Sequence, residues 1–434
     1  MSNDKKIRSN IELLAPAGNY QKMETAFLFG ADSVYLGGEE FGLRANAGNF
    51  TDDEIRKAVR FADSIGKRVY VTVNILARND DIDSIRNYVD VLYDAGVHGV
   101  IVSDIGVFLM IREMHPDLPV HVSTQANNLN YKTVEFWFKN GATRLNLARE
   151  LSLDEIAFIN KKLIEDIPGI AERGEPYLEA FVHGAMCMAF SGRCMLSDYL
   201  AGRSSNRGDC AQPCRWKYYI SEEQRPGELF EIAESERGTF LFNSKDLAMI
   251  RYLPELISSG VRALKIEGRM KSEFYLATVV KAYRNAIDAF LDDPSGYGSN
   301  TELLDHFSSE IGSCSHREYS TGFYFGGKGS QIYSSSSYIR DTDYLGYVKD
   351  CVRSSQDSHR ITLVQKGPFS EGESLEFLSP DCVRPVSVTV RDLRDRFGMP
   401  QKAAVVPVEE YTFVSDEPVS CGSTLRRKKT KNST

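Results

Sequence analysis

The 434-residue sequence contains no apolar run of about 18 residues, the length that a membrane-spanning helix needs. Its first ten residues, MSNDKKIRSN, are polar and lack the apolar segment of a signal peptide. An excess of basic charge is also missing, because 52 Lys and Arg against 60 Asp and Glu give a formal net charge of -8. These absences predict a cytoplasmic protein that does not enter a membrane. They exclude a wholly basic nucleic-acid-binding protein but not a local basic patch.

Short β-rich segments alternate with amphipathic segments through the first part of the chain. Several of the amphipathic segments end in glycine, a common stop signal for a helix. Eight such strands favour an α/β fold of the (β/α)8 TIM-like barrel type over a doubly wound sheet, which usually has about five or six strands. The predicted strands span residues 11–16, 33–38, 68–76, 99–103, 119–125, 144–149, 177–184 and 262–268.

Polar and apolar side chains alternate along four of these strands, so each strand has one polar face. Helices would cover the apolar faces, and the polar faces would then point into the barrel. The interior of a purely structural barrel is filled mainly by Val, Ile and Leu. A polar interior therefore predicts a ligand site at the C-terminal mouth, with an internal salt-bridge network as the structural alternative. The polar faces comprise Tyr70, Thr72 and Asn74; His121, Ser123 and Gln125; Glu179, Phe181 and His183; and Lys265, Glu267 and Arg269.

The alternation of strands and amphipathic segments ends at about residue 300. The stretch SQIYSSSSY (330–338) is rich in serine and is typical of a linker. The closely spaced β-like runs beyond it predict a small all-β barrel. The expected domains are a barrel at 1–300 with a cysteine-rich insertion at 187–217, a linker at 301–338, a β-barrel domain at 339–425 and a solvated basic tail at 426–434.

Four of the eight cysteines fall close together, at Cys187, Cys194, Cys210 and Cys214. Disulfides are rare in the cytosol, so such a group points to a metal, cluster or redox site. The spacing Cys-x6-Cys-x15-Cys-x3-Cys is neither that of most structural zinc sites nor a ferredoxin run. An iron–sulfur cluster, a structural Zn²⁺ and buried thiols therefore all stay open. The segment begins at the end of the seventh strand, where barrel active-site loops emerge.

Basic and aromatic residues surround these cysteines. The basic side chains suit either a thiolate-ligated cluster or a phosphate backbone, and the rings suit either base stacking or packing on the barrel rim. A cysteine nucleophile is the enzymatic alternative, because His183 lies four residues before Cys187 and can serve as its base. The surrounding residues are Arg193, Arg203, Arg207, Arg215 and Lys217, with Trp216, Tyr218 and Tyr219.

The stretch EAFVHGAMCMAFSGRCMLS (179–197) resembles the signature of the collagenase-like peptidase family U32. The resemblance extends over most of the chain, through ELLAPAGN (12–19), ADSVYLGG (31–38), STQANNLN (123–130) and LKIEGRMKS (264–272). Residues 225–247 and the C-terminal β domain are most similar to the tRNA-hydroxylating branch of that family.

The resemblance implies oxygen-independent hydroxylation of the tRNA wobble uridine to 5-hydroxyuridine, with prephenate as co-substrate. It implies a 4Fe–4S cluster on Cys187, Cys194, Cys210 and Cys214, with zinc as the alternative metal. Some relatives have a cysteine where this chain has Ala248; if that cysteine is a ligand in them, the fourth ligand here must come from Cys210 or Cys214. The implied partners are the tRNA anticodon stem-loop, a small dicarboxylate and iron–sulfur assembly proteins.

Roles at the site follow from side-chain chemistry. Guanidinium groups form bidentate pairs with carboxylates, so arginines at strand ends are expected to bind the dicarboxylate. The substrate-binding candidates are Arg44, Arg149, Arg269, Gln125 and Asn74, and the catalytic candidates are His183, Glu267 and Lys265. Two other functions stay open. One is a collagenase-like peptidase that uses His183 with Cys187 or a metal-bound water, and the other is an RNA-binding scaffold with a structural metal.

Overall fold

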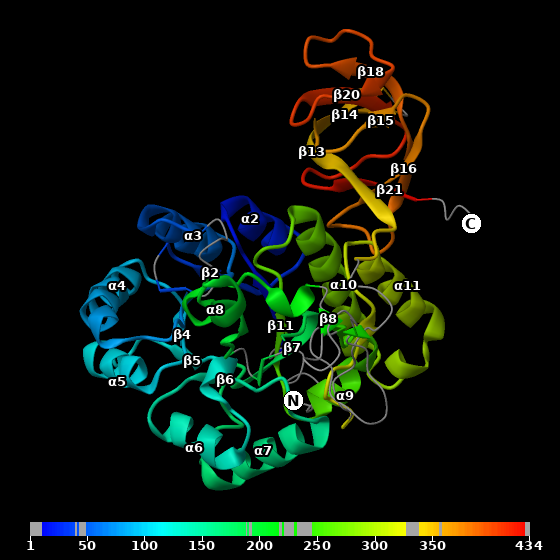
Figure 1. Ribbon diagram of the computed structural model, residues 1–434. Coiled ribbons are helices and arrows are strands. Elements are labelled where there is room, and N and C mark those ends of the chain that lie inside the picture. The colour runs from blue at the N-terminus through cyan, green and yellow to red at the C-terminus, as the bar shows by residue number, and fades with distance from the viewer. Residues whose placement is uncertain are drawn as a thin grey trace.

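The computed structural model of the protein describes residues 11–39, 41–42, 49–187, 189–190, 193–216, 219–220, 230–231, 245–326, 338–355 and 358–429. Its larger part is a closed barrel of eight parallel strands (Figure 1). The eighth strand pairs with both the first and the seventh, which closes the barrel. All eight predicted strands are confirmed. They are β1 (Glu12–Pro16), β2 (Ser33–Gly37), β3 (Arg68–Val73), β4 (Gly99–Val102), β5 (Val120–Val122), β6 (Arg144–Asn146), β7 (Leu178–Ala185) and β11 (Ala263–Ile266).

Helices surround the barrel, and capping residues in the sequence mark where two of them begin. Thr51 begins α3 and Ser152 begins α7, each through a reciprocal capping box with a glutamate three residues later. The helices are α2 (Tyr20–Leu28), α3 (Asp52–Ser64), α4 (Ile82–Asp94), α5 (Ile105–Met114), α6 (Tyr131–Lys139), α7 (Leu153–Asp166), α9 (Leu253–Ser258), α10 (Glu273–Asp292) and α11 (Thr301–Gly312). None of the helices in the described part of the chain has the length and apolar character needed to cross a bilayer.

The lower part of the barrel interior holds a buried ion network. Arg144 donates to both carboxylate oxygens of Glu12, at 2.8 and 2.7 Å, and lies 3.5 Å from Glu179. Lys265 in turn donates to Glu179 at 2.7 Å. Burial alone would raise the pKa of Glu12, but Arg144 holds that pKa below its usual value. The salt-bridge network that the sequence offered as an alternative is therefore present, but it fills only this part of the interior.

The C-terminal part is an antiparallel sheet that curls into a half-barrel (Figure 1). Its strand order is β17-β16-β21-β13-β14-β20-β18. Val390 alone separates β17 at one edge from β18 at the other, so the sheet must curl to bring its edges together. The strands are β13 (Thr342–Ser355), β14 (Ser358–Gln365), β16 (Ser374–Leu378), β17 (Val386–Thr389), β18 (Arg391–Asp395), β20 (Glu410–Ser415) and β21 (Thr424–Lys428), with β15 (Phe369–Ser370) and β19 (Ala403–Ala404) forming a separate pair.

Two predicted boundaries differ from the structure. The range expected to be a linker, 301–338, contains helix α11 packed along α10, and strand β12 (Tyr319–Ser320). The expected solvated tail starts inside strand β21, where Arg426 is fully buried. Arg426 donates to both oxygens of Glu310 on α11 at 2.9 Å and to Glu376 on β16. The prediction was wrong here because the partners that bury Arg426 lie far away in the sequence.

Replacing Arg426 by alanine should destabilise the protein strongly. The change leaves the buried Glu310 carboxylate without its cation, and we expect a loss of about 3–5 kcal/mol in the free energy of unfolding. Lys428→Ala is the matched control, because Lys428 pairs with the same Glu376 but its side chain is 53% exposed. We expect a loss below about 1 kcal/mol for that variant. Denaturant unfolding measures both, and equal losses would contradict this account.

Candidate active site

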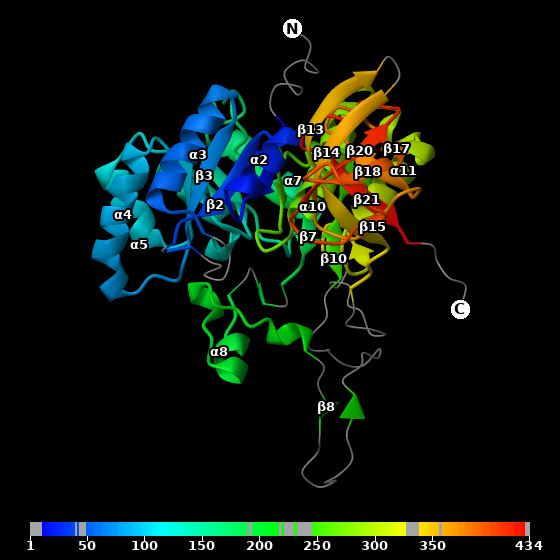
Figure 2. The ribbon, with the colours of Figure 1, turned by 90° about the horizontal axis from the view of Figure 1, so that it is seen from above.

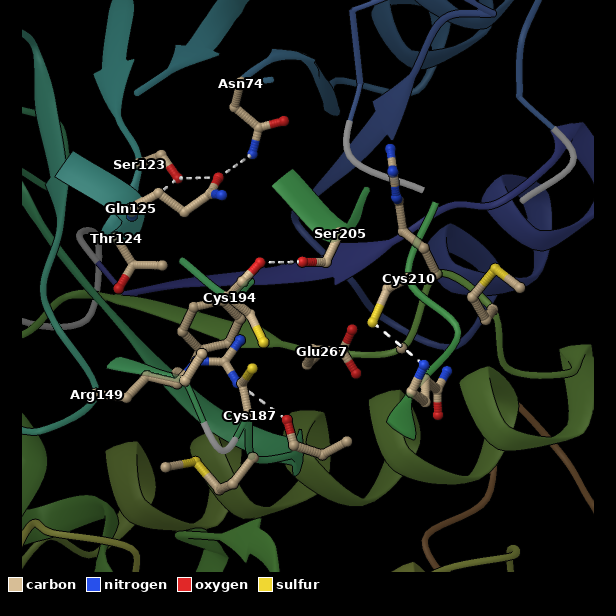
Figure 3. Close-up of a pocket in the computed structure, with 18 of the residues that line it drawn as sticks. Asn74, Ser123, Thr124, Gln125, Arg149, Cys187, Cys194, Ser205, Cys210 and Glu267 are labelled. Atoms are coloured by element: carbon tan, nitrogen blue, oxygen red, sulfur yellow. Dashed lines mark hydrogen bonds between the residues drawn. The ribbon is translucent and has the colours of Figure 1, made fainter. Parts of the chain in front are cut away.

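A cavity of about 540 Å³ opens at the C-terminal ends of the barrel strands. Asn74 follows β3, Gln125 follows β5, Arg149 follows β6 and Glu267 follows β11, and all four line this cavity. Their side chains face a common space (Figure 3). The ligand site predicted at the C-terminal mouth therefore has a physical counterpart in the upper part of the barrel interior.

The cysteine-rich segment continues from β7 and forms one wall of the cavity. It includes helix α8 (Leu196–Ala201) and short 3-10 turns at Ser205–Arg207 and Pro213–Arg215. Helix α8 projects from one end of the barrel (Figure 2). Arg207 anchors the segment by donating to both oxygens of Asp81, at 2.7 and 2.9 Å. This contact lowers the pKa of Asp81 to about 2, and Leu76 N also donates to Asn206 O.

All four predicted cysteines line this cavity. None of the four is in a disulfide, and three of them are labelled in Figure 3. Backbone N–H groups donate to two of the sulfurs, from Leu196 to Cys194 at 3.3 Å and from Gln212 to Cys210 at 3.4 Å. Such bonds stabilise negative charge on sulfur. Within the described ranges, however, no three His, Cys, Asp or Glu side chains are already arranged to hold a metal ion. The ligand role of the cysteines stays a prediction.

Arg149 and Arg269 both line the cavity, and their role in substrate binding stays a prediction. Arg149 lies 3.7 Å from the centre of the Phe181 ring and donates to Ala185 O at 2.9 Å. Arg269 is 4% exposed and donates to Thr72 Oγ1 at 3.3 Å. A Cβ at Gly37 would lie 2.2 Å from Arg269 Nη1, so only glycine at position 37 leaves room for this guanidinium. Arg44 lies outside the described residues.

Lys265 lines the floor of the cavity but is already paired with Glu179. Its ammonium group also lies 4.5 Å from the centre of the Tyr35 ring. Burial lowers the pKa of Lys265 even though Glu179 opposes that shift. The structure therefore joins Lys265 to the ion network below the cavity, while its predicted catalytic role stays a prediction.

His183 is not among the residues that line the cavity, so the prediction that its side chain points into the barrel is wrong. The register between β7 and β11 shifts after Phe181, which pairs with Lys265, so that His183 pairs with Ile266. The resulting bulge turns His183 toward the helices. There its ring lies 5.9 Å from Tyr275 and 5.5 Å from Tyr283, both on α10. Burial lowers the pKa of His183 to about 3, so the imidazole is neutral.

The remaining predicted residues come together at the cavity. Asn74 Nδ2 donates to Gln125 Oε1 at 3.1 Å. Glu267 follows β11, and its backbone is fixed because its N–H donates to His183 O and its carbonyl accepts from Tyr275 Oη at 2.7 Å. Figure 3 places the Glu267 carboxylate in the same space as Cys194 and Cys210.

Several lining residues escaped the sequence analysis as members of the site, among them Lys271, Phe323 and Tyr338. Lys271 stands two residues after Arg269, and this spacing beyond a strand end was the signal that could have revealed it. Phe323 and Tyr338 come from beyond the barrel strands. The Lys271 ammonium lies 4.7 Å from the centre of the Tyr338 ring. No local pattern in the sequence indicates that these two rings return to the cavity.

The fold and the cavity define a (β/α)8-barrel protein whose C-terminal mouth carries a cysteine-rich insertion over a polar, cationic pocket. The chain belongs to peptidase family U32, whose family model matches residues 18–333.

Curated relatives cover most of the chain. It is 38% identical to tRNA hydroxylation protein P1 of Bacillus subtilis, over 96% of this chain and 95% of that protein. It is 33% identical to tRNA hydroxylation protein P of Escherichia coli, over 92% of each. It is also 32% identical to a protein named collagenase from Porphyromonas gingivalis, over 78% of this chain and 80% of that protein.

The Arg207–Asp81 contact should hold the cysteine-rich segment against the barrel. We expect Arg207→Ala to speed the reaction of Cys194 and Cys210 with a thiol reagent several-fold in the metal-free protein. Arg203→Ala is the matched control, because Arg203 pairs with Asp209 inside the same segment and does not tie it to the barrel. Mass spectrometry of labelled peptides gives the rates. Equal rates in the two variants would show that Arg207 is not the anchor.

Proposed function

We propose that this protein hydroxylates the wobble uridine of tRNA to 5-hydroxyuridine, in the cytoplasm, without molecular oxygen. The observation that carries the proposal is the single cavity that four cysteines share with Arg149 and Arg269. The relatives named tRNA hydroxylation proteins, which align over nearly the whole chain, support RNA as the substrate.

The proposed cofactor is a 4Fe–4S cluster held by Cys187, Cys194, Cys210 and Cys214. The donor set fits, since four cysteines outside any disulfide line one cavity and two of them already accept backbone N–H bonds. When bound, the cluster would supply electron transfer or substrate activation beside the cavity. Because the described side chains form no ready ligand set, we infer that cluster binding draws the cysteines together. Iron–sulfur assembly proteins are the expected donors.

The proposed co-substrate is prephenate, a dicarboxylate that carries a ring. Arg149 and Arg269 are the groups suited to its carboxylates, because guanidinium binds carboxylate in a bidentate manner. Tyr35, Phe181 and Phe323 also line the cavity and offer apolar faces to the ring. Glu267, which also lines the cavity, is the proposed group for proton transfer.

The anticodon loop suits this cavity because its bases are single-stranded and cost little to turn outward. The described range 193–216 contains four arginines against two aspartates, whereas the whole chain has a net charge of -8. Arg203 and Arg207 pair with Asp209 and Asp81, so the segment beside the cavity has a modest local excess of basic residues, where phosphates of the loop would lie.

The structure does not bring together His183 and Cys187, the two residues of the proposed peptidase dyad. His183 packs among tyrosine rings on the helix side of β7, whereas Cys187 lines the cavity. A His183–Cys187 pair would need the bulge in β7 to be undone. A peptidase with a zinc-bound water stays as the alternative, and the name of the Porphyromonas relative is what favours it.

Alanine at any one of Cys187, Cys194, Cys210 and Cys214 should lower the iron content and reduce tRNA 5-hydroxyuridine to the level of a deletion strain. Cys421→Ala is the control, since Cys421 is an exposed thiol in the half-barrel. Mass spectrometry of tRNA nucleosides and metal analysis of anaerobically purified protein give the two readouts. Bound zinc with cleavage of denatured collagen, and unchanged 5-hydroxyuridine in the deletion strain, would favour the peptidase instead.

Arg269→Lys should weaken prephenate binding, because lysine cannot form the bidentate pair. Hydrogen bonds to charged groups contribute about 1.5–3 kcal/mol, so we expect a roughly 10- to 150-fold rise in Kd. Gly37→Ala should act in the same direction by displacing the guanidinium. Arg251→Lys, at a surface pair with Asp305, is the control. Calorimetric titration measures Kd, and a value unchanged from that of the unmodified protein in both Arg269→Lys and Gly37→Ala would remove Arg269 from the site.

A further inference from the structure

The lining of the cavity includes two chemically different sets of side chains. Cationic groups suit the carboxylates of a co-substrate. Amides and hydroxyls suit an uncharged polar group. The cationic groups are Arg149, Lys265, Arg269 and Lys271, and the neutral groups include Asn74, Ser123, Thr124 and Gln125.

Among the neutral groups, Gln125 is held in one orientation. Its Oε1 accepts from Asn74 Nδ2 at 3.1 Å and from Ser123 Oγ at 3.5 Å. The Ser123 hydroxyl accepts the backbone N–H of Gln125 at 3.4 Å, which leaves its own proton for Oε1. With Oε1 used in this way, the amide nitrogen Nε2 is the end of Gln125 that faces the cavity (Figure 3). Gln125 therefore presents N–H donors to a ligand.

The other neutral groups are engaged in holding this arrangement. Asn74 Nδ2 and the Ser123 hydroxyl support Gln125, and Thr124 Oγ1 donates to Leu147 O at 3.0 Å. Gln125 is only 7% exposed, so its donors lie in a site from which most water is excluded. Because water is scarce there, an N–H donor of Gln125 without an acceptor costs free energy. A ligand that supplies the acceptor is therefore favoured.

We propose that Gln125 selects uridine over cytidine by donating from Nε2 to O4 of uracil, an inference that rests on the proposed function. Uracil carries a carbonyl acceptor at position 4, where cytosine carries an amino donor. A fixed N–H donor therefore accepts uracil and repels cytosine. Carbon 5, the position hydroxylated, is bonded directly to carbon 4. The hydrogen bond from Gln125 to O4 therefore also positions carbon 5.

Gln125→Glu tests this assignment with little change in shape. One carboxylate oxygen keeps the bonds from Asn74 and Ser123, and the other replaces the N–H donors with an acceptor. Gln21→Glu, on the exposed face of helix α2, introduces the same charge change away from the cavity. The probes are two synthetic anticodon stem-loops that differ only by uridine or cytidine at the wobble position. Fluorescence anisotropy with the full-length, anaerobically prepared protein gives the ratio of the two Kd values.

The unmodified protein and the Gln21→Glu variant should bind the uridine stem-loop roughly tenfold or more tighter than the cytidine one. Gln125→Glu should abolish or invert that ratio, with iron content unchanged. An unchanged ratio in Gln125→Glu would overturn the inference. Nucleoside analysis of tRNA from a deletion strain complemented with the unmodified gene tests the proposed function separately, since missing 5-hydroxyuridine there would remove that function itself.

Discussion

The bidentate pair of Arg144 with Glu12, extended through Glu179 to Lys265, joins β1, β6, β7 and β11, including the strands between which the barrel closes. Each member is less than one-tenth exposed. Removing one partner would leave a buried charge without compensation, so the network has to be kept as a unit. It also sets the depth of the cavity, because the charged layer fills the lumen below Lys265. A ligand can therefore enter only from the C-terminal side.

The bulge between β7 and β11 decides which groups face that ligand. Up to the Phe181–Lys265 pair, both strands alternate regularly and direct polar side chains into the lumen. Beyond it, the shifted register sends His183 to the helix side, where tyrosine rings surround it. The same shift brings Glu267 N within 2.9 Å of His183 O, which fixes the start of the loop that carries Glu267 and Arg269. The shifted register thus leaves His183 outside the cavity, whereas Glu267 and Arg269 line it.

Sequence reasoning succeeded where the information is local and failed where it is not. The eight strands and most of the inward polar faces follow from the alternation of polar and apolar side chains over a few residues. The four cysteines at the cavity could be singled out by their number and their position after the seventh strand. His183 was misplaced because strand alternation is interrupted by pairing with a strand about 80 residues away, which no local pattern records. Arg426 was assigned to a solvated tail for a similar reason. Its carboxylate partner Glu310 stands 116 residues earlier, and only the docking of the half-barrel on α11 joins them. Phe323 and Tyr338 reach the cavity from beyond the barrel strands, again through tertiary contacts alone.

That docking connects the two parts of the molecule mechanically. Phe274 in the first turn of α10 stacks on Tyr344 of β13, with ring centres 5.2 Å apart and an interplanar angle of 12°. The neighbouring Tyr275 donates to Glu267 O, so the same helix turn touches both the half-barrel and the loop that lines the cavity. Tyr338, just before the half-barrel, lines the cavity beside Lys271. Because packed interiors transmit displacement rather than absorb it, the position of the half-barrel and the geometry of the cavity are constrained together. The half-barrel is therefore part of the framework that holds the site.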